Sequence, residues 1–174
     1  MKRGFIYFLI IVSLLLVGCN NELMVSATQQ LIINGDCVEG VTDAGRRATE
    51  IVIPDGIKTI GEKAFYSCSR LTKITIPNSV RTIDDCIFLN CKSLQYIKIP
   101  EGVSTIGEDC FYDCSSLAYV VIPSTVTSIG EYSFGLCNKL KDIYINQANA
   151  DVLNNTQYPK KGCTIHTNST GPNS

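Results

Sequence analysis

Apolar positions recur along this chain with a period of 23 residues. Each period holds two aliphatic residues separated by one variable residue, then a proline, a second aliphatic pair, a phenylalanine and a leucine. The prolines mark the period directly, at Pro54, Pro77, Pro100 and Pro123. Self-similarity at a period of roughly 20 to 50 residues is typical of a solenoid, in which each unit buries its apolar face only against its neighbours.

The first part of each unit predicts a short strand. In the second unit, alternation places Ile74 and Ile76 on one face and Thr75 on the other. Pro77 follows at once, and we expect it to end the strand because proline lacks the backbone donor that a ladder requires.

The second part of the unit predicts a further inward segment and a turn. In the second unit Val80 and Ile83 form this segment. The next position is glycine in three units and Asp84 in this one, which suits a backbone position with positive φ. We expect a turn of helix carrying Phe88 to follow.

The combined pattern is Ile-x-Ile-Pro, then Val-x-x-Ile-Gly, then Phe-x-x-Cys-x-x-Leu, and it closely resembles the BspA-like leucine-rich repeats of bacterial surface proteins. Four consecutive units match over residues 51–145, where Asn146 replaces the proline after a fifth strand. The resemblance implies an α/β, right-handed leucine-rich-repeat solenoid of four 23-residue units with a parallel sheet of short strands. It also implies an N-terminal cap over residues 31–50 and a C-terminal cap over residues 146–167, with strands at 31–33 and 163–165.

The N-terminus predicts export. Lys2 and Arg3 precede an apolar run over residues 5–17, which is too short to span a bilayer and is typical of a signal peptide. The run ends at Leu16, Val17, Gly18 and Cys19, which resembles the bacterial lipobox, so we expect cleavage after residue 18 and a lipid on Cys19. Residues 19–30 are then a tether and 168–174 a polar tail. An ordinary secretory signal is the alternative.

Charge excludes some functions. Loss of Lys2 and Arg3 would leave 13 basic against 16 acidic residues, a net charge of −3, which does not favour nucleic acid. The sequence contains no recognisable catalytic motif. It has a single histidine, His166, and neither a nucleophile elbow nor a phosphate-binding glycine loop. We therefore predict a non-enzymatic protein that needs no cofactor.

The nine cysteines would usually indicate a disulfide framework in an exported chain. Here four of them recur every 23 residues, so we expect a column of buried thiols whose parallel side chains cannot adopt disulfide geometry. These are Cys68, Cys91, Cys114 and Cys137. Cys37 and Cys163 are expected in opposite caps, while a bridge between Cys86 and Cys110 stays open. No pattern here predicts a metal site, because there is no Cys-x-x-Cys pair and His166 is expected on the surface of the last strand.

A second column contains acids: Glu62, Asp85, Glu108 and Glu131. Each is expected to begin a helical turn, where free backbone donors favour a negative charge. Binding of a divalent cation along this column is the alternative interpretation.

The variable strand positions predict a contact surface. Read across the strands, one row contains Glu50, Lys73, Tyr96, Tyr119 and Asp142, and the next contains Val52, Thr75, Lys98, Val121 and Tyr144. Tyrosines flanked by mixed charge are typical of interface hot spots. The candidate partner-binding residues are therefore Lys73, Tyr96, Lys98, Tyr119, Asp142 and Tyr144. The alternative is that tyrosine simply favours strands.

The resemblance implies a bacterial cell-surface lipoprotein that acts in adhesion, with host matrix proteins, host cells or other bacteria as partners. We expect it to be anchored through Cys19, in the outer membrane and exposed at the surface. The short sheet predicts weak single contacts, so clustering of many copies would supply multivalent attachment. A structural subunit of an envelope complex and a carbohydrate-binding module are the alternatives.

Overall fold

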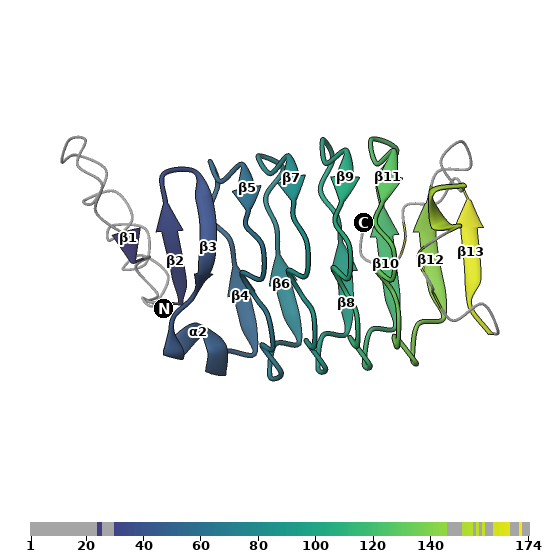
Figure 1. The fold of residues 1–174 in the computed structure, drawn as a ribbon, viewed down its shortest axis with the longest axis horizontal. Coiled ribbons are helices and arrows are strands. Elements are labelled where there is room, and N and C mark those ends of the chain that lie inside the picture. Colours follow the sequence, from purple (N-terminus) through teal and green to yellow (C-terminus); the bar gives the residue numbers. More distant parts are fainter. Residues whose placement is uncertain are drawn as a thin grey trace, which may run out of the picture.

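The computed structural model describes residues 24–25, 30–145, 151–154, 156, 158, 162–167 and 171. The chain winds into a solenoid whose coils follow one another along the long axis of the molecule (Figure 1). Each repeat contributes one strand to each of two sheets, which run along the two sides of a shared apolar core.

The strand before each proline lies in what we call the front sheet. Its strands are β4 (Glu50–Val52), β6 (Lys73–Thr75), β8 (Tyr96–Lys98), β10 (Tyr119–Ile122), β12 (Asp142–Ile145) and β13 (Thr164–Thr167). Neighbours pair in parallel at the register of the repeat, so Tyr96, Tyr119 and Asp142 share one row. In the described part of the chain the sheet consists of two ladders, because no strand pairing joins β6 to β8.

The second inward segment also forms strands, which the alternation of so short a segment did not reveal. They are β5 (Thr59–Ile60), β7 (Thr82–Ile83), β9 (Thr105–Ile106) and β11 (Ser128–Ile129), and they pair in parallel. We call this set, with its N-terminal extension, the back sheet.

The N-terminal cap extends the back sheet. A hairpin of β2 (Leu31–Asn34) and β3 (Cys37–Val41) places β3 parallel to β5, and β1 (Met24–Val25) pairs antiparallel with β2. The helix α2 (Asp43–Arg47) follows, and the side chain of its N-cap residue Thr42 accepts a hydrogen bond from Gly45 N. No helix in the part of the chain that the structure describes is long and apolar enough to cross a membrane.

The segment carrying the phenylalanine is not the helical turn that the sequence suggested. In the first unit the N–H of Ala64 donates to Gly61 O at 3.1 Å, and the N–H of Tyr66 donates to Lys63 O at 2.9 Å, so the segment is a run of four-residue turns. The N–H of Phe65 instead donates to Ile87 O of the next coil at 3.0 Å. In an α-helix the Phe65 N–H would donate to a carbonyl oxygen four residues earlier in the same segment. Here it donates to the next coil, and this bonding between coils explains why the segment is not helical.

Two residues of every unit adopt positive φ without being glycine. In the first unit these are Lys63 at 58° and Ser67 at 57°, and their N–H groups donate to Asp85 O and Leu89 O of the next coil. Such bonds hold a backbone conformation that is otherwise unfavourable. The equivalent residues are Cys86, Asn90, Asp109, Asp113, Tyr132 and Leu136.

The expectation of positive φ at the recurring glycine position is wrong, since neither the glycines nor Asp84 adopts it. Close approach between coils explains the glycines instead. A Cβ built on Gly130 would lie 2.4 Å from Glu108 N, and one on Gly107 would lie 2.4 Å from Asp85 Oδ1. At Gly61 the nearest atom would be Val38 O at 3.4 Å, an ordinary contact.

The core is continuous along the solenoid. Phe65, Phe88, Phe111 and Phe134 are fully buried and form a stack whose ring centroids lie 5.3, 5.3 and 5.6 Å apart. The inward residues of both sheets pack around this stack. Each unit therefore buries its apolar side chains mainly against the same positions of its neighbours.

Candidate binding face

The predicted tyrosine cluster is present on the outward face of the front sheet. The rings of Tyr96 and Tyr119 stack with centroids 5.2 Å apart and an interplanar angle of 7°. Tyr144 meets Tyr119 edge-on at 6.2 Å. Tyr96 and Tyr119 are 23 residues apart and lie directly opposite each other in the parallel ladder. Tyr144 lies diagonally across from Tyr119, because the residue opposite Tyr119 on β12 is Asp142.

His166 extends this cluster, which the sequence had suggested only as a surface position. Its ring stacks on Tyr144 with centroids 4.5 Å apart, and its Nε2 lies 2.7 Å from Asp142 Oδ1. The pairing of β13 with β12 places Tyr144 opposite His166. We call Tyr96, Tyr119, Tyr144 and His166 the aromatic column. Alignment of the closing strand with the repeats would have identified His166 as the fourth residue of the aromatic column.

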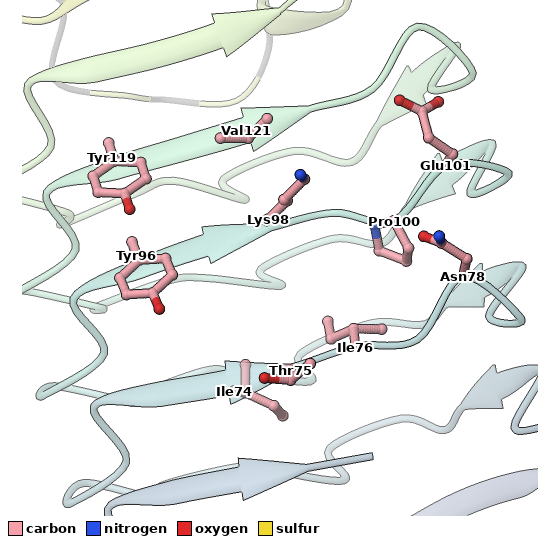
Figure 2. Close-up of a pocket in the computed structure, with 10 residues that line it drawn as sticks. All are labelled: Ile74, Thr75, Ile76, Asn78, Tyr96, Lys98, Pro100, Glu101, Tyr119 and Val121. Atoms are coloured by element: carbon pink, nitrogen blue, oxygen red, sulfur yellow. The ribbon is translucent and has the colours of Figure 1, made fainter. Parts of the chain in front are cut away.

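A groove of about 330 Å³ lies where the strand pairing is interrupted, between β6 and β8 (Figure 2). Tyr96 and Lys98 project from β8, while Thr75 and Ile76 lie on the opposite side. The remaining lining residues are Ile74, Asn78, Pro100, Glu101, Tyr119 and Val121. Apolar surface, hydroxyl groups and both signs of charge thus meet in one depression, an arrangement suited to contact with a partner.

The predicted cations of this face differ in their surroundings. Lys73 is 4.0 Å from Glu50 across the β4–β6 ladder, an exposed pair that contributes little stability. Lys98 is exposed and forms no ion pair with any described residue. Lys98 lines the groove and Lys73 does not, so the structure separates two lysines that the sequence grouped together.

The four repeating cysteines form the expected buried column. The Cys91 thiol donates to the carbonyl oxygen of Phe65, 26 residues earlier, at 3.1 Å, and two further units repeat this bond. Burial raises the pKa of Cys91 and Cys114, which keeps both thiols protonated and unreactive. All eight described cysteines are free, including Cys86 and Cys110 and the two in the caps. Cys19 lies outside the described residues.

The acidic column does not begin helical turns, which corrects the interpretation from the sequence. Asp85 Oδ1 instead accepts a hydrogen bond from Glu108 N of the next coil at 2.9 Å. Glu62 pairs with its neighbour Lys63. Among the residues that the structure describes, no group of three His, Cys, Asp or Glu is placed to hold a metal ion.

Solved structures from bacteria share this fold. A leucine-rich cell surface protein from Faecalibacterium prausnitzii is 32% identical, with a TM-score of 0.57 over 62% of this chain and 28% of its own. A leucine-rich repeat protein from Eubacterium ventriosum is 23% identical, with a TM-score of 0.63 over 79% of this chain and 37% of its own. The Treponema pallidum leucine-rich repeat protein is 24% identical, with a TM-score of 0.56 over 76% of this chain and 74% of its own.

The chain thus spans less than half the length of the first two of these proteins. None of the curated proteins matches it. The model of the BspA type leucine rich repeat region, with six copies, matches residues 44–163, which reaches beyond the four units into both caps. The chain therefore belongs to the BspA-type leucine-rich repeat family, whose members are in general non-enzymatic proteins that bind other macromolecules.

Proposed function

We propose that this chain is a lipid-anchored, non-catalytic protein of the bacterial cell envelope that binds a protein partner through the outward face of its front sheet. The observation that carries this proposal is the aromatic column beside the groove that Lys98 lines. Tyrosines packed in this way supply a large contact area that is already ordered before binding.

The packing of the rings favours a protein over a glycan. A carbohydrate platform needs exposed ring faces, but Tyr96 and Tyr119 face each other and Tyr144 stacks on His166. The column therefore offers mainly ring edges and hydroxyl groups to a partner. The face of Tyr96 that turns away from Tyr119, toward the groove, is the exception (Figure 2).

The size of the face predicts weak single contacts. Six strands at a spacing of about 4.8 Å make a front sheet about 24 Å wide. Its strands have three or four residues, so the face falls well below the roughly 800 Å² per partner of a standard interface. Attachment would then depend on many anchored copies acting together.

Anchoring through a lipid on Cys19 would provide such clustering. The charged N-terminus, the apolar run and the cysteine support export and lipidation. A similar Faecalibacterium prausnitzii protein is described as a cell surface protein. We place this chain in the outer membrane, exposed at the surface, where host matrix proteins, host cells or other bacteria are its partners.

Adherence of whole cells tests the binding face. Cells that display the chain would be applied to collagen-coated surfaces, epithelial cells and a layer of other bacteria. The double variant Tyr96→Ala, Lys98→Ala should lower adherence by roughly tenfold or more, because it removes two hot-spot side chains. The matched control Thr82→Ala, Thr105→Ala changes two exposed positions of the back sheet and should leave adherence unchanged. Equal loss in both variants, or binding only to glycans on an array, would contradict the proposal.

Protease treatment of intact cells tests the location. The chain should be lost from the cells, and Cys19→Ala should release it from the membrane fraction. Survival of the chain, together with recovery in a stoichiometric complex with another envelope protein, would favour the structural-subunit alternative.

A further inference from the structure

The front sheet opens between β6 and β8 because a bond that its neighbours form is missing there. Between the first two units, Ile53 N donates to Thr75 O at 3.0 Å, and the third and fourth units repeat this bond. In the described part of the chain, the equivalent bond from Ile76 N to Lys98 O is not formed. We call the opening between β6 and β8 the seam.

The two coils remain joined on both sides of the seam. Gln95 N donates to Thr72 O at 3.1 Å where the two strands begin, and β7 pairs with β9 in the back sheet. The seam is therefore a local separation of two strands within a continuous solenoid, and the groove described above lies over it.

The side chain of Arg81 lies between the same two coils. Its Nη1 donates to Asn78 O at 2.7 Å and to Val80 O at 3.0 Å, so the guanidinium is held by its own coil. A Cβ built on Gly102 of the next coil would lie 2.8 Å from this Nη1. The glycine thus admits the guanidinium between the coils, where it holds the seam apart at one end.

The opening exposes part of the apolar core at the floor of the groove. Ile74 is 5% exposed and Ile76 is 9% exposed, and both line the groove. The equivalent inward residues of the other front-sheet strands before β13 are at most 3% exposed: Ile51, Ile53, Ile97, Ile99, Val120, Ile122, Ile143 and Ile145. An aliphatic side chain placed in the seam would remove this remaining surface from water.

The charge at the seam is positive. Lys98 is exposed over it and forms no ion pair with any described residue. Glu101 lies at the far end of the groove beside Asn78 (Figure 2). The guanidinium of Arg81 lies against Gly102, the residue after Glu101, and offsets its negative charge. Lys98 is therefore left to attract an anionic group.

We propose that the seam binds an extended segment of a protein partner that presents an acidic side chain to Lys98 and an aliphatic side chain to Ile74 and Ile76. In an extended chain, side chains two residues apart lie on the same face, so one short segment supplies both. The groove of about 330 Å³ is near the lower limit of ligand pockets, which suits a few side chains. This inference rests on the proposed function, since it names what the same face recognises.

Short peptides test the recognition. The probe is the capped tripeptide acetyl-Asp-Gly-Leu-amide, and its controls replace the aspartate by lysine or the leucine by glycine. In the whole chain held in detergent micelles, the first peptide should shift the methyl resonances of Ile74, Ile76 and Val121 with a Kd on the order of 1 mM. Each control should bind at least fivefold more weakly. Equal shifts from all three peptides, or no shift from any, would overturn the inference.

Two pairs of variants locate the binding. Lys98→Glu should reverse the preference from the aspartate peptide to the lysine peptide, whereas Lys139→Glu makes the same charge change at an exposed position outside the groove and should keep it. Thr75→Trp fills the groove and should abolish binding. Thr82→Trp, at an exposed position of the back sheet, should not. An unchanged preference in Lys98→Glu, or full binding in Thr75→Trp, would overturn the inference.

Adherence separates this inference from the proposed function. If the peptides bind without selectivity but Tyr96→Ala, Lys98→Ala still lowers adherence, the proposed function stands and recognition by the seam fails. If the aspartate peptide binds selectively but cells displaying Lys98→Glu adhere as well as cells displaying Lys139→Glu, the seam remains a binding site and adhesion through this face fails.

Discussion

The Cys137 thiol donates a hydrogen bond of 3.1 Å to the carbonyl oxygen of Phe111 in the preceding coil. The same carbonyl oxygen also accepts from Cys114 N, at 3.1 Å, so the thiol adds a second bond to a group that is already satisfied. The repeating cysteine thus links adjacent coils and fills the core without any covalent bond. This explains why a chain with nine cysteines needs no disulfide along its repeats.

Alkaline pH should destabilise the solenoid through these thiols. Burial raises the pKa of Cys137 from 9.0 to about 12. The folded state holds this proton more tightly than the unfolded state, so the stabilisation is complete below pH 9 and is lost as the pH rises from 9 toward 12. Within that window each pH unit should lower the free energy of unfolding by about 1.4 kcal/mol for this thiol.

Urea denaturation at several pH values measures this effect. Cys137→Val removes the ionisable group, so its free energy of unfolding should fall less steeply above pH 9 than that of the unmodified chain. Cys86→Asn, at a partly exposed position whose positive φ asparagine tolerates, should change the slope far less. Identical slopes in all three chains would show that the buried thiol does not control alkaline stability.

Substitution of one recurring glycine should lower the free energy of unfolding, whereas the same substitution at another should not. Gly130→Ala places a Cβ against the backbone of Glu108 and should cost about 1–3 kcal/mol, as overpacking does. Gly61→Ala occupies the same position of the first unit, where it makes only an ordinary contact. It should be neutral or stabilise by up to about 1 kcal/mol, because alanine restricts the unfolded chain. Thermal denaturation of both variants measures this difference, and an equal loss of stability in both would contradict selection of the glycine by close approach between coils.

Loss of an internal phenylalanine should cost more than loss of a terminal one. Phe88 stacks between Phe65 and Phe111, so Phe88→Ala should lower the free energy of unfolding by about 3–5 kcal/mol. Among the described residues, Phe134 has one ring neighbour, Phe111. Phe134→Ala should therefore lower the free energy of unfolding by less than Phe88→Ala does, as measured by denaturant titration. An equal or larger loss would show that stability does not depend on stacking from both sides.

Much of this architecture could be predicted because the repeat is regular. Residues 23 apart occupy equivalent positions, so the buried cysteine column and the row of Tyr96 and Tyr119 follow once the units are aligned. The back-sheet strands could not be recognised, because two residues such as Thr82 and Ile83 are too short to show alternation.

Features that depend on contacts between coils were also beyond the sequence. Whether the N–H of Phe65 bonds within its own turn or to Ile87 depends on how close the next coil lies, and no local pattern encodes that distance. The interrupted strand pairing between β6 and β8 falls between two units that keep the 23-residue spacing, so the sequence does not mark it. The repeat therefore predicts which residues occupy equivalent positions in the solenoid, but it does not predict where the structure departs from the repeat.

Photo-crosslinking on living cells tests the binding face most directly. A photoreactive phenylalanine analogue would replace Lys98 in the groove or, as a control, Thr82 on the back sheet. We expect a covalent adduct with a partner protein from position 98 and none from position 82. Adducts only from position 82, or equally from both positions, would contradict the claim that this chain binds its partner through the front sheet.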